Sequence, residues 1–424
     1  MGKNIGFVST RFSGTDGVTL EAGKWAEVLK KNGHTCFWFG GELDRSPQKS
    51  LLVPEAHFKH EQNVWISDNV WGKKSRAPAV TDMIHTIKSR IKQRLNEFID
   101  RFGIDLLIAQ NVLTIPMHIP LGVALTEIIA ETRIPTIAHH HDFYWERTRF
   151  SIGAVGDYLR MAFPPNLHNI EHVVINSAAQ EELALRTGIS SVIIPNVLDF
   201  ENPPVINGEK TVHLRQNIGL GPDDIMILQP TRIVQRKGIE HAIELVKELK
   251  DPRCKLVISH EAGDEGFEYA EWLKENARSQ GVDLLFVNTY MNDHWHTGTE
   301  KQAQQLGDCF LLDLYPHADF ITYPSLYEGF GNAFLEAIFF RKPMLINRYA
   351  IFVKDIEPQG FDLVVMDGFL TSKNVNQVKE ILASSAHREK MVNHNFEIAR
   401  RHYSYKVLQK KLNYLLDIFF GVEN

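Results

Sequence analysis

Two glutamates in the C-terminal third of the chain are separated by a short glycine-rich turn. The segment spans residues 325–336, and its acidic residues are Glu328 and Glu336. The glycines between them let the backbone bend sharply and come close to a ligand. We expect a helix to begin near Asn332, so that its free N–H groups face the turn and favour an anion. Such a loop suits a ligand with both phosphates and hydroxyls, such as a nucleotide sugar, although a capped surface helix can show the same carboxylate spacing by chance.

A basic loop at residues 229–238 follows an apolar, strand-like run and precedes a helical pattern. Its cations suit a diphosphate, because Arg232 offers a forked guanidinium and Lys237 a point charge. By itself this segment is explained equally well as a solvated surface loop. Together with the two glutamates, the diphosphate interpretation is favoured.

A third loop, residues 12–17, follows the first strand-like run and contains two glycines. Loops of this kind, between a strand and a helix, bind phosphates through backbone amides and the positive end of the helix. The glycine spacing matches neither the dinucleotide fingerprint nor a Walker loop, so a dinucleotide oxidoreductase is disfavoured. A lone turn like this one is more often structural than functional.

Three adjacent histidines, residues 139–141, precede Asp142. Neighbouring side chains of a strand face opposite ways, so three in a row do not converge on one ion, and we expect no metal site. We expect His141 to end the strand, beside Asp142, where it can bind a polar ligand. Arg147 and Arg149 follow and suit an anionic group, although solvated surface arginines are the commoner outcome.

Short apolar runs alternate with helix-like segments along the whole chain, which predicts mostly parallel, doubly wound sheets of the α/β class. The strand-like runs are residues 5–9, 36–39, 106–109, 136–138, 172–175, 191–194, 225–229, 255–259, 283–287 and 320–323. The alternation breaks at residues 199–208, which are typical of a linker. We therefore expect one domain over residues 1–198, a second over 199–402, and a final helix over 403–424 that packs back on the first. Two such halves would place a ligand in the crevice beyond the carboxyl ends of their strands.

The composition is that of an ordinary globular protein of 424 residues, with 44% hydrophobic and 23% charged residues. The net charge of −6 argues against nucleic acid as the main partner. No apolar run is long enough to span a bilayer, and no signal peptide is visible, so we expect a cytoplasmic location. The three cysteines fit a reducing compartment and exclude a disulfide framework and a cysteine-built zinc site. Nothing in the sequence indicates an oligomeric state.

A predicted helix over residues 84–102 carries four cations, Lys88, Arg90, Lys92 and Arg94. A face of this kind can touch anionic lipid, so peripheral membrane contact stays open as an alternative. We favour the simpler interpretation that the charges form the solvated side of a core helix.

Taken together, these segments resemble the retaining nucleotide-sugar glycosyltransferases of sequence family 4, which have the GT-B architecture of two Rossmann-like domains facing across a cleft. The resemblance covers nearly the whole chain in order. Its most specific signature is the pair Glu328 and Glu336 with the intervening Gly-Phe-Gly. The chain departs from the family at Asn196-Val197, where Asn-Gly is usual, and at residues 260–264, where a glycine-rich turn is expected. These departures weaken inferences about the base of the donor but not about the type of reaction.

The resemblance implies a role for each residue of the motifs. Glu336 would bind the ribose hydroxyls of the donor, and Glu328 the hydroxyls of the transferred sugar. Arg232 and Lys237 would neutralise the diphosphate, and His141 would touch the sugar near the reacting carbon. The other donor contacts would come from Gly17, Phe330, Gly331 and Asn332. A small anionic acceptor, for instance a sugar-glycerate, is expected on the N-terminal half near Asp16, Tyr144, Arg147 and Arg149, while lipid-linked and polysaccharide acceptors stay open.

The expected reaction is transfer of a hexosyl group from a UDP- or GDP-linked sugar to an acceptor hydroxyl, with retained anomeric configuration. The resemblance suggests front-face attack, and a double displacement through Glu328 is the other route. No Asp-x-Asp pair occurs, so no essential metal is expected, and the nucleotide sugar is a co-substrate rather than a cofactor. The alternatives are a sugar-nucleotide epimerase or hydrolase and a non-catalytic nucleotide-sugar sensor.

Overall fold

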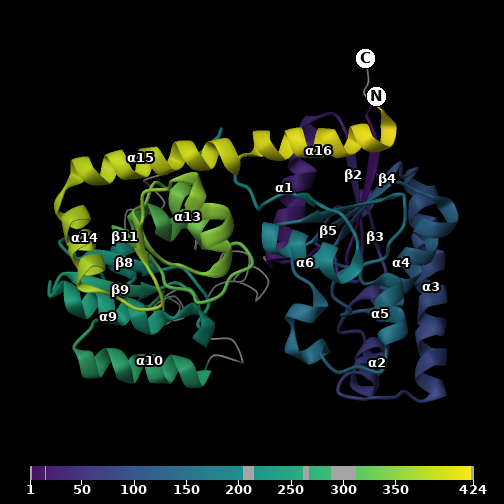
Figure 1. Ribbon diagram of the computed structural model, residues 1–424, viewed down its shortest axis with the longest axis horizontal. Helices are drawn as coiled ribbons and strands as arrows, with labels where there is room; N and C mark the ends of the chain where they lie inside the picture. Colours follow the sequence, from purple (N-terminus) through teal and green to yellow (C-terminus); the bar gives the residue numbers. More distant parts are fainter. Residues whose placement is uncertain (1, 15, 204–213, 261–266, 288–311, 422–424) are drawn as a thin grey trace. The chain divides into compact units, whose positions relative to one another are not determined.

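The chain divides into two compact units in a computed structural model, which describes residues 2–14, 16–203, 214–260, 267–287 and 312–421 (Figure 1). The first unit comprises Met1–Asn196 together with Tyr405–Asn424, and the second comprises Val197–Ser404. The last helix, α16 (Tyr405–Phe420), therefore belongs to the first unit and packs there with α1 (Gly17–Lys31). Of the predicted linker, residues 204–208 lie outside the described residues.

The first unit is built on a parallel sheet with the strand order β3-β2-β1-β4-β5-β6-β7. The strands are β1 (Asn4–Val8), β2 (Thr35–Gly40), β3 (Ser50–Leu52), β4 (Leu106–Gln110), β5 (Thr136–His140), β6 (Ile170–Val174) and β7 (Val192–Ile193). Most of their residues are buried, as expected for a parallel sheet covered on both faces. Because β1 pairs with both β2 and β4, the direction of winding reverses between β1 and β4.

The helices of the first unit connect these strands and cover the sheet (Figure 1). Besides α1 and α16 they are α2 (Glu61–Val70), α3 (Pro78–Phe102), α4 (Ile119–Thr132), α5 (Gly156–Ala162) and α6 (Ser177–Thr187). Helix α3 begins at Pro78, earlier than predicted, because proline is well suited to the first helical turn, and it ends before Gly103 in the left-handed conformation. Its buried stripe includes Ile84, Ile91 and Phe98, as the spacing predicts.

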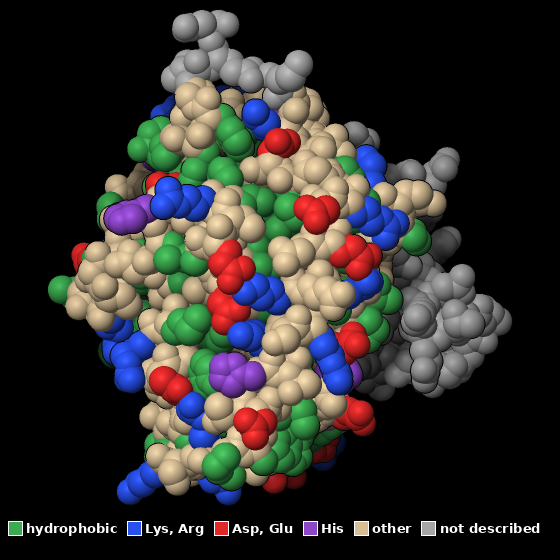
Figure 2. All heavy atoms as spheres, turned by 90° about the vertical axis from the view of Figure 1, so that its right-hand side faces the viewer, with side chains coloured by type: hydrophobic (Ala, Val, Ile, Leu, Met, Phe, Trp, Pro, Cys, Tyr) green, Lys and Arg blue, Asp and Glu red, His purple; other side chains and the backbone are tan. Residues whose placement is uncertain are grey.

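The basic side of α3 is largely neutralised by acidic neighbours. Lys88 and Lys92 each place Nζ 2.9 Å from a carboxylate oxygen of Glu127 on α4, and Lys92 also contacts Glu131. Figure 2, which views the molecule from the right-hand side of Figure 1, shows acidic and basic side chains interspersed rather than gathered in one patch. None of the helices in the described part of the chain combines the length and apolarity that a bilayer span requires.

The second unit repeats the same plan with the strand order β10-β9-β8-β11-β12-β13. Its strands are β8 (Ile225–Gln229), β9 (Cys254–Ile258), β10 (Leu284–Phe286), β11 (Phe320–Tyr323), β12 (Met344–Asn347) and β13 (Val364–Met366). Its helices are α8 (Leu214–Asn217), α9 (Ile239–Leu249), α10 (Phe267–Gln280), α13 (Asn332–Phe339), α14 (Ser372–Ala383) and α15 (Ser385–His402). Strand β8 pairs with β9 and β11, so here the winding reverses between β8 and β11.

The predicted fold class, doubly wound parallel sheets of the α/β class, is confirmed. Every predicted strand is present, with ends shifted by a residue or two, whereas β3, β12 and β13 were not predicted. Two of the cysteines, Cys36 and Cys254, are buried free thiols, and burial raises the pKa of Cys36 to about 12. The third, Cys309, lies outside the described residues.

Candidate active site

The basic loop and the glutamate loop are neighbours in the second unit. One follows β8 and the other follows β11, and these two strands pair with each other. The loops are also tied together directly, because the backbone N–H of Leu326 donates to the carbonyl of Arg236 at 2.9 Å and Arg236 Nη1 donates to the carbonyl of Tyr327 at 3.0 Å. The loops therefore meet where the winding of the sheet reverses, which is where open α/β sheets bind ligands.

Lys237 and Glu328 form an ion pair in which both side chains are 10% exposed. Lys237 Nζ donates to Glu328 Oε1, and Arg236 Nη1 lies 3.4 Å from Oε2. Burial raises the pKa of Glu328, but the charge of Lys237 and the hydrogen bond from Lys237 more than offset this, so the pKa falls below its ordinary value. Glu328 is therefore an ionised carboxylate inside the protein.

Three cations gather at this loop. Burial lowers the pKa of Lys237, the negative charge of Glu328 opposes that effect, and the positive charges of Arg236 and Arg232 reinforce it. Arg232 and Arg236 are themselves exposed at the loop surface. The structure thus brings together both predicted cations and adds Arg236, which sequence analysis did not single out although it adjoins Lys237.

The sharp turns of both loops depend on glycine. Gly238 has a φ of 60°, and a Cβ there would lie 2.6 Å from the carbonyl oxygen of Pro324. Gly331 has a φ of 117°, and a Cβ there would lie 2.7 Å from the hydroxyl of Tyr349. That hydroxyl donates to the carbonyl of Phe330 at 2.7 Å, which anchors the backbone of the glutamate loop.

Helix α13 begins at Asn332, as the sequence predicts, and Gly331 is its N-cap residue. Because glycine has no side chain to cap the helix, the positive end of α13 remains available to an anion. Glu336 follows one turn later and is half-buried. Its Oε2 accepts a hydrogen bond of 2.6 Å from the hydroxyl of Tyr315, a fully buried side chain stacked on Phe340. Nothing in the sequence around Tyr315 signals this role.

The first unit has a pocket of about 130 Å³ at the point where its own sheet reverses. Residues 9–11, which follow β1, line one side, and residues 110–112, at the end of β4, line another. Asp16 and Val18 lie at the start of α1, and Phe58, Ile115 and Met117 complete the wall. The two units therefore carry polar residues at equivalent points of the same topology.

Asp16 is the N-cap of α1 and uses both of its carboxylate oxygens. Oδ1 accepts from the backbone N–H of Val18 at 3.1 Å and of Thr19 at 3.2 Å. Oδ2 accepts from Thr19 Oγ1 at 2.8 Å and from Arg11 Nη2 at 2.9 Å. Gly17, the first residue of α1, has open space where a side chain would stand, so a ligand can approach its backbone.

The three histidines alternate in direction, as the strand geometry predicts. His139 Nδ1 and His141 Nε2 lie 3.0 and 3.2 Å from Gln110 Oε1, whereas His140 faces Thr114 and His172. The prediction that His141 ends the strand was wrong by one residue, because β5 ends at His140. In the described ranges, no group of three or more His, Cys, Asp or Glu side chains is arranged to hold a metal ion.

His141 is a neutral imidazole at ordinary pH. Burial lowers its pKa to about 4, although the nearby charges of Asp142 and Asp16 oppose this. The backbone N–H of His141 donates to Asn111 Oδ1 at 3.1 Å, which fixes the start of the loop. His141 can therefore offer a hydrogen bond to a polar ligand but brings no charge to it.

The other predicted acceptor residues do not line the pocket of the first unit. Arg147 is exposed and binds Asp142 through Nη2 and through Nε, the latter at 2.7 Å. Arg149 is also exposed, and its guanidinium lies 4.4 Å from the centre of the Phe150 ring. Tyr144 opens a short 3-10 turn that ends at Glu146. The cation that lines the pocket is Arg11 instead. The only sign of this role in the sequence is that Arg11 follows β1.

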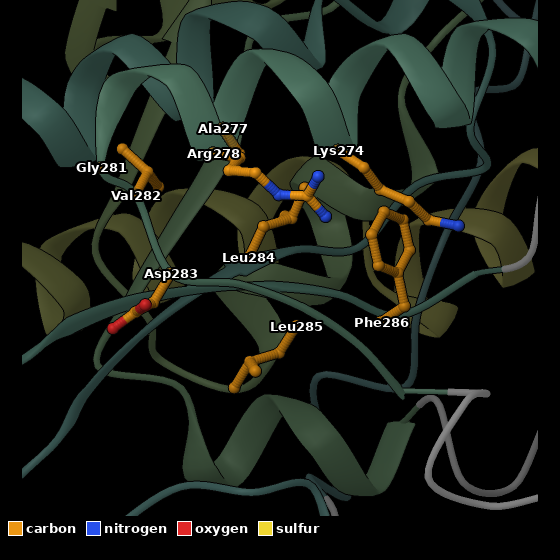
Figure 3. Close-up of a pocket in the computed structure, with 9 residues that line it drawn as sticks. All are labelled: Lys274, Ala277, Arg278, Gly281, Val282, Asp283, Leu284, Leu285 and Phe286. Carbon is orange, nitrogen blue, oxygen red and sulfur yellow. The ribbon is translucent and has the colours of Figure 1, made fainter.

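A larger, open hollow of about 580 Å³ runs beside β10 in the second unit (Figure 3). Lys274 and Arg278 project from α10, and Phe286 and Asp283 come from β10 and the segment before it. No predicted site residue lines this hollow. It lies along the outermost strand of the described sheet rather than beyond the carboxyl ends of strands, so it does not define the active site.

Comparison with known proteins identifies the class of enzyme. The family described as "Glycosyl transferases group 1" matches residues 212–397. Two mannosylglucosylglycerate synthases are similar over most of the chain. The one from Thermotoga maritima is 32% identical, covering 94% of this chain and 96% of its own, and the one from Petrotoga mobilis is 33% identical, covering 85% and 86%.

A crystal structure of a glycosyltransferase from Rickettsia africae has the same fold, with a TM-score of 0.68 over 99% of this chain and 100% of that one, at 14% sequence identity. The fold is therefore that of the GT-B glycosyltransferases. The chain belongs to the group 1 glycosyltransferases.

Proposed function

We propose that this enzyme transfers a hexosyl group from a UDP- or GDP-linked sugar to a hydroxyl of a sugar-glycerate, with retention of anomeric configuration. The observation that carries the proposal is the pairing of Arg236 and Lys237 with the carboxylate of Glu328 where the second sheet reverses, with Arg232 on the same loop and close enough to affect the pKa of Lys237. The identity of the acceptor is supported by the names of the two relatives, which describe synthases of mannosylglucosylglycerate. Mannosyl is the first hexosyl group to test as the one that the enzyme transfers.

The cations would act on the leaving group. As the bond between the anomeric carbon and the diphosphate breaks, negative charge builds up on the phosphate oxygens. Arg232, Arg236 and Lys237 would stabilise that charge, and fixed groups of this kind in a site shielded from water contribute strongly to rate. Glu328 holds the Lys237 ammonium in place, so little reorganisation is needed during the reaction.

Retention would follow from attack on the face that the leaving group departs from. In this front-face route the acceptor hydroxyl forms the new bond at the anomeric carbon, and a phosphate oxygen of the departing diphosphate takes its proton. A covalent intermediate on Glu328 is less well supported, because Lys237 and Arg236 both engage its carboxylate. That engagement lowers its nucleophilicity and suits it to binding sugar hydroxyls instead.

The remaining residues would position the donor. Glu336, held by Tyr315, would accept hydrogen bonds from the ribose hydroxyls. The backbone amides near Gly331 and Asn332 would bind the transferred sugar or the phosphate at the start of α13. The neutral imidazole of His141 would bind the sugar near the reacting carbon. A positively charged imidazolium at this place would repel the positive charge of the developing oxocarbenium ion. No essential metal is proposed.

The test is a panel of UDP-, GDP- and ADP-linked glucose and mannose, each incubated with and without glucosylglycerate. Released nucleotide reports turnover, and proton NMR of the product compares its anomeric configuration with that of the donor. We expect release that depends on the acceptor, retained configuration, and activity that survives EDTA. Release without acceptor would identify a hydrolase or epimerase, binding without turnover a sensor, and an inverted product would refute the front-face route.

A further inference from the structure

The pocket of the first unit is too small for a whole sugar ring but suits a three-carbon acid. Its volume is about 130 Å³. A cavity of about 150 Å³ holds a molecule of roughly six heavy atoms such as benzene. A glycerate group has about the same number of heavy atoms as benzene and fits this volume. A hexose has about twice as many heavy atoms and is too large for it. A sugar-glycerate would therefore place its glycerate end inside and its sugar outside.

Arg11 supplies a cation to this pocket with much of its hydrogen-bonding capacity left over. Its Nη2 donates to Asp16, and its guanidinium lies 5.5 Å from the centre of the Phe58 ring. Among the described residues, Nε and Nη1 have no protein partner. The planar fork of an arginine matches the two oxygens of a carboxylate, which makes Arg11 suited to bind an acid.

Asp16 does not cancel this site, because it is fixed by other contacts. Its oxygens cap α1, so the carboxylate holds Arg11 in place and cannot follow it toward a ligand. Val18 lines the same wall, but its backbone N–H is already bound to Asp16, so the start of α1 adds no free donor to this wall. The attraction of the pocket for an anion therefore comes from Arg11.

Gln110 offers a second donor at the same place. Its Oε1 accepts hydrogen bonds from His139 and His141, so the amide nitrogen of Gln110 faces away from these two histidines. In the part of the chain that the structure describes, Gln110 Nε2 is buried and has no hydrogen-bond partner, and Gln110 lines the pocket. A buried amide without a partner costs free energy, which an oxygen of a bound ligand would recover once the amide turned toward the pocket.

We propose that this pocket binds the carboxylate end of the acceptor and that Arg11 selects an acid over the corresponding neutral alcohol. The proposal rests on the proposed function and adds to it the group of the acceptor that is recognised and the residue that recognises it. It replaces Arg147 and Arg149, the cations expected from the sequence, with Arg11.

The test compares glucosylglycerate with glucosylglycerol, which differs only in having a neutral hydroxymethyl group in place of the carboxylate. We expect the wild-type enzyme to favour the acid in kcat/KM. Arg11→Gln should raise KM for the acid by about 10- to 100-fold, the effect of losing a charge-assisted hydrogen bond, and should leave kinetics with the neutral acceptor unchanged. Arg11→Lys, which keeps the charge but not the fork, should fall between the two.

The matched control is Arg147→Gln, an exposed arginine of the same unit that lies outside the pocket. A loss of acid preference in this control, or an equal effect of Arg11→Gln on both acceptors, would overturn the proposal. Circular dichroism and thermal unfolding verify that each variant is folded.

Calorimetric binding of both acceptors without donor tests the pocket separately from the proposed function. Binding of the acid that depends on Arg11, but without transfer, would support the pocket and refute the proposed function. Transfer to both acceptors without dependence on Arg11 would refute the pocket alone.

Discussion

Lys237 and Glu328 are 91 positions apart in the chain, yet they form a buried ion pair across the two central strands of the second sheet. From the sequence, the two residues have separate expected tasks, Lys237 on the diphosphate and Glu328 on the sugar. The contact indicates that the tasks are coupled, because the carboxylate that would bind the sugar also orients the ammonium that would bind the leaving group. A change in either residue should therefore affect both stability and rate.

Replacing Lys237 by methionine, which keeps the length of the side chain and removes its charge, tests this coupling. We expect kcat at saturating donor to fall by about 10²–10³, as for loss of one donor to a developing anion. Stability should also fall, by about 3–5 kcal/mol, because the buried Glu328 loses its closest partner and keeps only the longer contact with Arg236. Steady-state kinetics and urea denaturation measure the two effects.

A second substitution separates stability from catalysis. In the double variant Lys237→Met/Glu328→Gln the unpaired buried charge is gone, so most of the stability should return while activity stays low. Lys247→Met, at an exposed position of α9, is the matched control and should change neither property. Wild-type turnover in the single variant would rule out a role for Lys237 in the reaction.

Tyr315→Phe tests whether Glu336 is positioned for the ribose. Without the phenolic hydroxyl, Glu336 loses the hydrogen bond that orients it, so KM for the donor should rise about tenfold with little change in kcat. The variant should also discriminate less between the natural donor and its 2′-deoxy analogue, a readout that a merely structural defect would not alter.

Tyr269→Phe provides the control for this prediction, because Tyr269 donates to Glu240 in the same unit in a similar Tyr–Glu pair outside the motif loops. It should leave KM and the deoxy discrimination unchanged. If both variants raised KM equally, the effect of Tyr315 would be general destabilisation.

The glycine turns give a third prediction. Gly331→Ala would press a Cβ against the Tyr349 hydroxyl in a backbone conformation that alanine avoids, so the loop that carries Phe330 must move. We expect calorimetry to detect no donor binding at concentrations that saturate the wild type. Gly360→Ala, with a φ of 84° but nothing within 4 Å of the new Cβ, should cost only about 1–2 kcal/mol of stability and keep donor affinity. Equal donor affinity in the two variants would contradict a special role for Gly331.

The local parts of the site were predictable from the sequence, and the long-range contacts were not. Glycines, charges and an α13 that begins at Asn332 are encoded within a dozen residues, so their pattern is readable without the fold. The roles of Arg11 and Tyr315 could not be recognised from the sequence. Tyr315 meets Glu336 only through the tertiary structure, and Arg11 meets Asp16 only through the capping geometry of α1. Arg147, one of the two arginines expected to bind an anion, pairs with Asp142 in its own loop, and its role in acceptor binding stays a prediction.

The missed strands have a similar explanation. Strands β3 and β13 are three residues long, which gives each of them only a weak pattern, although β10 is as short and was predicted. Strand β12 is fully buried, but it is short, follows a proline and ends in an asparagine, which weakens its pattern. That asparagine, Asn347, donates to the carbonyl of Ser325 at 3.0 Å and so braces the glutamate loop.

A buried histidine should make the first unit sensitive to mild acid. His118 is 1% exposed, and its Nδ1 caps α4 by accepting from the N–H of Leu121 at 3.1 Å. Nε2 lies 2.8 Å from the carbonyl of Glu55 and donates to it, so the neutral ring has both nitrogens occupied. Burial lowers the pKa of His118 to about 4, despite the opposing hydrogen bond with Glu55.

Because the pKa of His118 is lower in the folded state than the ordinary value near 6.5, the unfolded chain binds more protons between those two values. Its contribution to stability is thus complete above pH 6.5 and is lost as the pH falls toward 4, by about 3 kcal/mol in all. His118→Asn keeps a capping oxygen but cannot titrate, so urea denaturation from pH 7 to 4.5 should show a shallower loss of stability than the wild type. His168→Asn, at an exposed position of the same unit, should leave the slope unchanged, and an unchanged slope in His118→Asn would mean that this histidine does not set the acid sensitivity.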